Sequence, residues 1–463
     1  MMFQPIKASS RTSHEDPRPQ RLFLLLAPFL FAAYALLVPP FQTFDETQHL
    51  QRAWQVSQFE VSAERRGRQS GGDLPPGLGK AAIAQLAEIK PQGERHVIVH
   101  PFADIFSQNT SPGYDQPPVF YNFFGAAVYS PIGYLPQALV IRIGQATGMS
   151  VEWIVRAGRL LNAAICIALV AWALALMPFG RWVMMTIGLL PPVAAGAASM
   201  GQDGLIVGCG FVITAWSLKA AVEGRWRMRG AVTLGLAAVT ATLAKFVYLP
   251  LVGIALLPKP RRTSWLRWIA VPFAVGCIAA LALLGWMSVN AHALVKFLPD
   301  LPSMGEQVVW IVTNPIRFAT LIAQTYWHLL PYAWAGFYAF GDSTVPIILP
   351  AAIAGTQAIL LAMICGDRAH DLTQSRRLWM LLIFATVPVL IATALFISFN
   401  PPGTHHIEGF QSRYLSPVLP LAAIALMRRS ASPSRLLAPG TLALTLAAHA
   451  ATLGTMLRTF YSF

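Results

Sequence analysis

Long apolar runs recur along the chain, and short polar stretches separate them. About 20 apolar residues, rising roughly 1.5 Å each, cross the hydrocarbon layer of a bilayer as a helix. The pattern predicts about eleven such helices, at residues 22–38, 153–177, 182–198, 204–221, 230–244, 246–258, 265–287, 345–364, 378–398, 414–427 and 438–459. The chain is therefore expected to be an all-α polytopic membrane protein.

Two further apolar stretches are not expected to cross the membrane as single helices. Counting residues 117–147 as one span would reverse the side on which every later loop lies, and Pro131, Gly133 and Pro136 favour a broken helix. Residues 307–340 are rich in Trp and Tyr, which favour the membrane interface. We expect both stretches to form interfacial or re-entrant helices. They belong to a long first extracytoplasmic loop, residues 39–152, and to a second extracytoplasmic segment, residues 288–344.

Composition supports a membrane protein. Of the 463 residues, 55% are hydrophobic and only 12% are charged, whereas a soluble domain has about 25% charged residues. The four cysteines lie in or beside apolar runs without metal or redox spacing, so we expect small core hydrophobes. The first apolar run lacks a small-residue cleavage site and is expected to remain as an anchor. Residues 1–21 are predicted to be a cytoplasmic tail and residues 22–463 a single membrane domain.

The basic residues gather in short loops, as they do on the cytoplasmic side of membrane proteins. These residues are Lys7, Arg11, Arg18, Arg21, Arg225, Arg227, Arg229, Lys259, Arg261, Arg262, Arg368, Arg376, Arg377, Arg428, Arg429 and Arg435. With the N-terminus inside the cell, all of them fall on the cytoplasmic side. This arrangement explains much of the net charge of +14. The expected partner is therefore the lipid bilayer, and no nucleic acid is expected.

A cluster of charges follows the first apolar run, in the stretch "FDETQHLQRAWQVSQ" (44–58). Read as a helix, it places Asp45, His49 and Arg52 on one face, with Leu50 and Trp54 opposite. We expect an amphipathic helix lying on the outer membrane surface. In the simplest interpretation its acidic residues stabilise the helix start, with Thr43 as the cap, and its polar face is solvated. A catalytic role is the alternative.

The same stretch resembles the "PDEPAHFxRAYQIAxG" signature of the domain of unknown function 2142 family of bacterial membrane proteins. Similar segments follow in the same order: "YSPIGYLPQALVIRIGQATGMS", "RAGRLLNAA" (156–164), "SMGQDGL" (199–205), "AKFVYLPLVGIALLPKP" (244–260) and "FQSRYLSPVLP" (410–420). The resemblance covers most of residues 20–430. Thr47 and Gln48 depart from the Pro-Ala of the signature, which affects the local backbone and not the carboxylates.

That family in turn resembles the GT-C superfamily of glycosyltransferases, multi-helix enzymes that use polyprenyl-phosphate-linked sugars. Their hallmark is an acidic residue in the first extracytoplasmic loop. Members also carry a Pro-Pro segment before an interfacial helix, an arginine at the outer end of the second helix, and a lysine in a short helical hairpin. Here "DQPPVFYNFF" (115–124), Arg156 or Arg159, and Lys245 occupy those places.

The resemblance implies a catalytic role for the acidic pair, with Asp45 as the base and Glu46 as its helper or as a metal ligand. The candidate substrate-binding residues are His49, Arg52, Arg156, Arg159, Asp203, Lys245, Arg413 and Tyr414, of which Lys245 and the arginines at 156, 159 and 413 are candidates for the phosphate. No cofactor is otherwise implied, and a divalent metal is left open.

Each candidate also has a structural interpretation. Lys245 can extend to the interface without a ligand, although a lysine at mid-membrane costs about 2.5–3.5 kcal/mol and is by default functional. The arginines can anchor helix ends, and Asp203 lies in an ordinary Asp-Gly turn. The sequence "HHIE", with His405, His406 and Glu408, is a weak metal signal in a polar loop.

The expected function is an inverting transfer of a sugar from a polyprenyl-phosphate donor to an envelope glycan or glycolipid acceptor. The expected location is the bacterial inner membrane, with the active site facing the periplasm. A lipid or polysaccharide transporter is the rival class, although the sequence shows no inverted repeat. A polysaccharide polymerase or ligase is a second rival. Sugar, acceptor and oligomeric state are not predicted.

Overall fold

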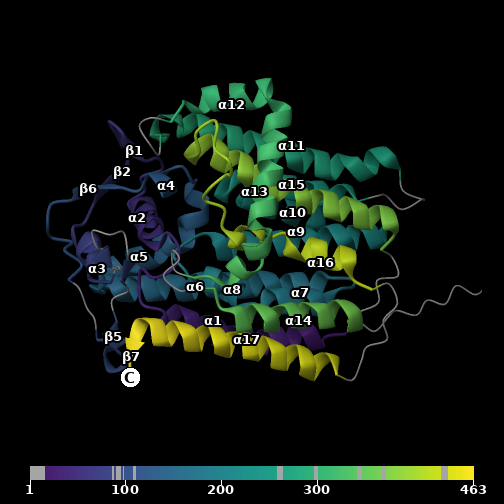
Figure 1. The fold of residues 1–463 in the computed structure, drawn as a ribbon, viewed down its shortest axis with the longest axis horizontal. Helices are drawn as coiled ribbons and strands as arrows, with labels where there is room; N and C mark the ends of the chain where they lie inside the picture. The colour runs from purple at the N-terminus through teal and green to yellow at the C-terminus, as the bar shows by residue number, and fades with distance from the viewer. Residues whose placement is uncertain are drawn as a thin grey trace, which may run out of the picture.

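The protein is mostly helical, as the apolar pattern predicts, and its strands are short (Figure 1). The computed structural model describes residues 16–85, 88–89, 95–96, 99–107, 111–257, 264–296, 301–340, 347–366, 372–428 and 436–463. Within these residues, six helices are long and apolar enough to cross a membrane. They are α1 (Arg18–Leu37), α6 (Val151–Leu176), α9 (Asp203–Glu223), α11 (Trp265–Val289), α15 (Gln374–Phe399) and α17 (Leu437–Phe460).

The other five expected spans are shorter or broken, so the number eleven is not confirmed. The stretch 182–198 forms two short helices, α7 (Arg181–Gly188) and α8 (Pro191–Ala197), because the residue before a proline is held extended. The stretch 414–427 forms the 3₁₀ turn η6 (Ser412–Leu415) and α16 (Leu419–Leu426). The remaining three stretches form α10 (Met228–Ala244), the 3₁₀ helix η3 (Phe246–Leu256) and α14 (Leu349–Cys365).

A separate layer built from residues 46–147 covers one end of the helix bundle, on the left in Figure 1. A three-stranded antiparallel sheet has the order β1-β2-β6. Two smaller pairs are β3 with β4, antiparallel, and β5 with β7, parallel. The elements of this layer are α2 (Glu46–Ser57), β1 (Glu64–Arg66), β2 (Gln69–Leu74), α3 (Gly77–Gln85), β3 (Glu88–Ile89), β4 (Arg95–His96), β5 (His100–Pro101), η1 (Phe102–Asp104), β6 (Val119–Asn122), α4 (Phe124–Ala127), η2 (Pro131–Tyr134) and α5 (Leu135–Thr147). The partner of β5 is β7 (Tyr461–Ser462), which brings the C-terminus to this end.

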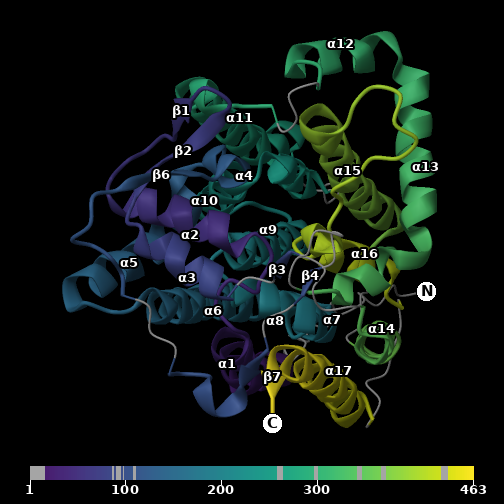
Figure 2. The same ribbon diagram turned by 60° about the vertical axis from the view of Figure 1, so that its left-hand side comes forward.

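Neither of the two segments expected at the interface contains one of the six membrane-length helices. Residues 117–147 form β6, α4, η2 and α5, with Pro131 opening η2 and Pro136 in the first turn of α5. The second expected extracytoplasmic segment, residues 288–344, contains four further elements. They are η4 (Ala291–Ala293), α12 (Met304–Thr313), α13 (Pro315–Ala333) and η5 (Ala335–Tyr338). In Figure 1, α13 runs across the direction of the long helices, and in Figure 2 it lies along the edge of the bundle.

Several of the basic residues expected in cytoplasmic loops lie at the other end of the bundle, where they bond to helix ends. The side chain of Arg376 donates to the carbonyl of Ala221, and that of Arg377 donates to the carbonyls of Ala425 and Met427. Arg18 pairs with Asp16, which also accepts a bond from Trp182. Eight of the expected cytoplasmic residues lie outside the described part of the chain: Lys7, Arg11, Lys259, Arg261, Arg262, Arg368, Arg429 and Arg435. Arg18, Arg376 and Arg377 thus lie at the opposite end of the helices from the layer of residues 46–147.

Candidate functional site

Helix α2, which carries the charged stretch, is buried within the protein. This corrects the expectation of a surface helix with a solvated polar face. Its residues from His49 to Ser57 are all buried, because α5, α4, β2 and η2 pack around it. Asp45 precedes the helix in the left-handed region, with φ of 55°, and its side chain makes no capping bond. The charged residues of α2 are therefore held by protein groups, and each has a definite partner set.

Glu46 and Arg159 form a closed ion pair with no exposed side-chain surface. The Glu46 carboxylate accepts two bonds from Arg159 and one each from the backbone N–H groups of Phe41 and Met200. Arg159 also donates to the carbonyls of Ala35, Val38 and Pro39. These contacts occupy about four acceptor sites of the carboxylate and all five guanidinium donors. The arrangement leaves neither side chain free to bind a substrate.

The buried environment of Glu46 has two opposing effects on its pKa. Burial raises the pKa of Glu46. The Arg159 charge and the hydrogen bonds that Glu46 accepts lower the pKa, and together they outweigh burial, so the net pKa lies below its usual value. The Glu46 side chain is therefore a stable carboxylate, which suits a structural anchor between α2 and α6 better than a proton acceptor.

Arg52 and Arg156 lie apart from the polar cluster at Asp45. Arg52 donates to the carbonyls of Val61 and Tyr129, at 2.6 and 3.1 Å, and to the side chain of Gln55. Arg156 donates to the carbonyl of Ile105 at 2.6 Å and lies 5.3 Å from the ring of Trp153. Both arginines tie loops to helices, so the structure does not bring them to the candidate site.

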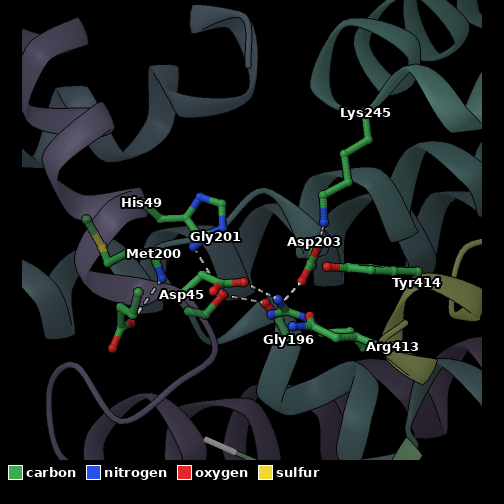
Figure 3. Close-up of polar contacts among 12 residues, drawn as sticks. Asp45, His49, Gly196, Met200, Gly201, Asp203, Lys245, Arg413 and Tyr414 are labelled. Carbon is green, nitrogen blue, oxygen red and sulfur yellow. Dashed lines mark hydrogen bonds and ion pairs between the residues drawn. The ribbon is translucent and has the colours of Figure 1, made fainter. Parts of the chain in front are cut away.

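The remaining charged candidates form one connected cluster (Figure 3). Arg413 donates to Asp45 at 2.9 Å, and its other terminal nitrogen lies 3.2 Å from Asp203. Lys245 donates to the second oxygen of Asp203 at 2.8 Å. The order is therefore Asp45–Arg413–Asp203–Lys245, with two cations and two carboxylates.

The four charges come from four distant parts of the chain, and each lies at the end of an element. Asp45 precedes α2, and Asp203 is the first residue of α9, where the helix dipole favours a negative charge. Lys245 joins α10 to η3, and Arg413 lies in η6. The cluster therefore forms only when four element ends meet at one end of the bundle.

The charged cluster is shielded from water, except at Asp45. The side chains of Lys245, Arg413 and Asp203 are 10%, 11% and 14% exposed, whereas that of Asp45 is 39% exposed. The ring of Tyr414 lies 4.5 Å from the Lys245 ammonium, and the ring of Phe44 lies 4.5 Å from the Arg413 guanidinium. Asp45 is thus the open edge of the cluster.

His49 faces the charged cluster from α2. Its Nδ1 lies 2.7 Å from the hydroxyl of Tyr134, and its ring stacks on Tyr129. Burial lowers the pKa of His49 to about 4, so the ring is neutral at physiological pH. Tyr129 and Tyr134 were not among the residues expected at the site, although "YSPIGY" contains both and was among the segments with a family resemblance.

A pocket lies beside Arg413, on the side of α1, α8 and η5. Its cavity volume is about 30 Å³, and the wider space around it, open solvent included, is about 500 Å³. Its walls are mostly apolar and include Tyr34, Val38, Phe44, Pro192, Ala195, Phe337, Phe340 and Met456, with Gln42, Thr43 and Ser199 as polar members. Of the described residues that line it, Arg413 is the charged one. The pocket therefore joins an apolar space to the cationic end of the cluster.

The described residues contain no group of three or more His, Cys, Asp or Glu side chains placed to hold a metal ion. In the sequence "HHIE", His406 lies 3.7 Å from Glu408 and stacks on His328 of α13, while both partners of the pair are largely exposed.

Comparison with protein families gives one match. The family model described as predicted membrane protein DUF2142 matches residues 26–422, from α1 to α16. The match includes every charged residue of the cluster. No curated protein matches the chain.

Proposed function

The chain belongs to the DUF2142 family of predicted membrane proteins, and on that premise we propose that it is a glycosyltransferase of the GT-C type. It transfers a sugar from a polyprenyl-phosphate donor to an envelope glycan or glycolipid, with inversion. The protein lies in the bacterial inner membrane with its N-terminus in the cytoplasm, and the site faces the periplasm. The distribution of basic loops supports this orientation, because Lys and Arg favour the cytoplasmic side.

One observation carries the proposal: Arg413 lies both in an apolar pocket and in an ion pair with Asp45. A lipid phosphate has an apolar chain and an anionic head, and this junction offers a place for each. Lys245, which also meets Asp203, supplies a second cation near the same position. Charge-assisted bonds from Arg and Lys are the usual means of holding phosphate.

The reaction can be written with the groups at hand. The bond between the anomeric carbon and the phosphate oxygen breaks, and its electron pair leaves with the phosphate. The acceptor hydroxyl or amine forms the new bond to that carbon from the opposite face, and its proton moves to the Asp45 carboxylate. The phosphate gains one negative charge as Asp45 loses one, so the net charge of the site is unchanged. Arg413 and Lys245 stabilise the charge that develops on the phosphate.

The role of Asp45 as the base is supported by comparison with its neighbour. Glu46 has all its oxygen lone pairs engaged and no exposed side-chain surface. Asp45 is 39% exposed and, within the described part of the chain, makes a single ion pair. Only Asp45 has an oxygen that an acceptor can reach, so the adjacent acids divide into a base and an anchor.

The test is transfer in proteoliposomes that contain the purified protein and labelled polyprenyl-phosphate sugars. We expect labelled sugar on an added envelope glycan or glycolipid acceptor, together with release of polyprenyl phosphate. A transporter would instead move the lipid between leaflets with its phosphate–sugar bond intact, and a polymerase or ligase would require a lipid-linked oligosaccharide. Either outcome in place of monosaccharide transfer would refute the proposed reaction.

A further inference from the structure

Arg413 pairs with Asp45, the proposed base, and is also a proposed cation for the donor phosphate. We propose that Arg413 holds Asp45 in the resting protein, and that the donor phosphate releases Asp45 by taking its place on Arg413. The base then becomes available only when the donor is bound. This inference rests on the proposed function, because it assigns a regulatory role to the residues of that site.

An added phosphate would leave the neutral cluster with excess negative charge unless one carboxylate leaves its cation. The two cations and two carboxylates of the cluster sum to a formal charge of zero, and all four are joined by bonds of 2.8–3.2 Å. An incoming anion therefore meets cations that already have partners. Because charges in a poorly hydrated site interact strongly, the phosphate binds best where it replaces one of these carboxylates.

Asp45 is the carboxylate that the structure frees more easily. Asp203 bonds to both Lys245 and Arg413, is 14% exposed, and lies at the start of α9. Among the described residues, the Asp45 side chain pairs with Arg413 alone; it is 39% exposed and makes no capping bond to α2. Asp203 therefore stays as the residue that positions both cations, and Asp45 moves.

The position of the pocket supports the same exchange. Phe44, the neighbour of Asp45, lines the pocket together with Arg413 and packs against the guanidinium. A lipid whose chain lies along the apolar wall of this pocket brings its head to Arg413, which Asp45 already holds. The expected consequence is ordered binding, with the donor first, because the base is freed only after the donor phosphate has taken its place on Arg413.

The experiment measures binding without transfer, using undecaprenyl phosphate and the purified full-length protein in detergent. Because Asp45→Asn removes the competing charge, we expect it to bind undecaprenyl phosphate about tenfold more tightly than the wild type, as for a lost competing bond to a charged group. Asp73→Asn is the matched control: its carboxylate pairs with Arg66 in the exposed sheet and should leave binding unchanged. Equal or weaker binding by a folded Asp45→Asn protein overturns the inference.

A second measurement uses the wild-type protein alone and stays informative if the variant does not fold. Carboxyl labelling with a water-soluble carbodiimide and an amine, read by mass spectrometry, should rise at Asp45 when undecaprenyl phosphate is added, while labelling of Asp203 stays low. Unchanged labelling of Asp45 despite measured binding refutes the exchange but leaves the proposed phosphate site in place. If the wild type does not bind undecaprenyl phosphate, the proposed function itself falls.

Discussion

The two adjacent acids Asp45 and Glu46 should respond in opposite ways to loss of their charge. Glu46→Gln removes the partner of a buried arginine, and the new amide places N–H donors against the donors of Arg159 and of a backbone N–H. Breaking a buried pair from one side costs about 3–5 kcal/mol. Glu46→Gln should therefore lower the free energy of unfolding by that amount.

Asp45→Asn should have a small effect on stability and a large effect on rate. Its partly exposed ion pair contributes about 1 kcal/mol or less. The left-handed backbone at this position, with φ of 55°, also suits asparagine. Loss of a positioned base lowers a rate at least about a hundredfold. We expect an inserted, folded protein that binds donor and transfers little sugar.

The assay combines thermal unfolding in detergent with transfer in proteoliposomes at matched protein amounts. Glu60→Gln is a suitable control, because it makes the same chemical change on an exposed carboxylate just beyond α2. If Glu46→Gln unfolds like the wild type but does not transfer, while Asp45→Asn transfers normally, the roles are reversed. If both single variants and the double variant remain active, neither acid is the base and the enzyme proposal loses its main support.

Four further predictions follow from the site and the fold. Lys245→Ala should weaken binding of the polyprenyl-phosphate donor about ten- to a hundredfold, because a bond to charged phosphate contributes about 1.5–3 kcal/mol. It should also lower the unfolding temperature, because it removes one partner of the largely buried Asp203. Unchanged donor affinity in the folded variant would show that the lysine only pairs with Asp203. Ala195→Phe should obstruct the apolar pocket and raise KM for long-chain donors more than for short-chain ones, and an equal rise for both would place the chain elsewhere. The pKa of His49 is lowered to about 4 in the folded protein, so only the unfolded state takes up the proton as the pH falls below about 6.5, and the free energy of unfolding declines from there towards pH 4. His49→Gln should reduce that decline in melting experiments, and an unaltered pH profile would contradict the prediction. In a cysteine-free background, an impermeant thiol reagent should label Ala146→Cys and His405→Cys on intact cells, and Met228→Cys only after the membrane is opened; the reverse pattern would invert the proposed orientation.

The sequence by itself determined the class of the protein. Runs of about 20 apolar residues are visible in the sequence itself, and they predict membrane helices because crossing the lipid requires an apolar helix of about that length. Six of the expected spans are confirmed as helices of membrane-crossing length, and the family match confirms the resemblance carried by the charged stretch. The sequence also placed Asp45, Asp203, Lys245 and Arg413 at the ends of apolar runs, which is where the structure finds them.

Only the tertiary structure decided which charged residues meet. Glu46 and Asp45 are neighbours in sequence, yet the left-handed turn before α2 directs one to Arg159 and the other to Arg413. Arg159 and Arg413 are equal candidates as residue types. Nothing in the local sequence shows that all five donors of Arg159 bond to Glu46 and to carbonyls at and just beyond the end of α1. The burial of α2 was missed for the same reason: its periodicity describes two faces, but the layer that covers both is built from residues up to about 90 positions away. Local pattern fixes helices and their ends, whereas ion pairs depend on how those ends pack together.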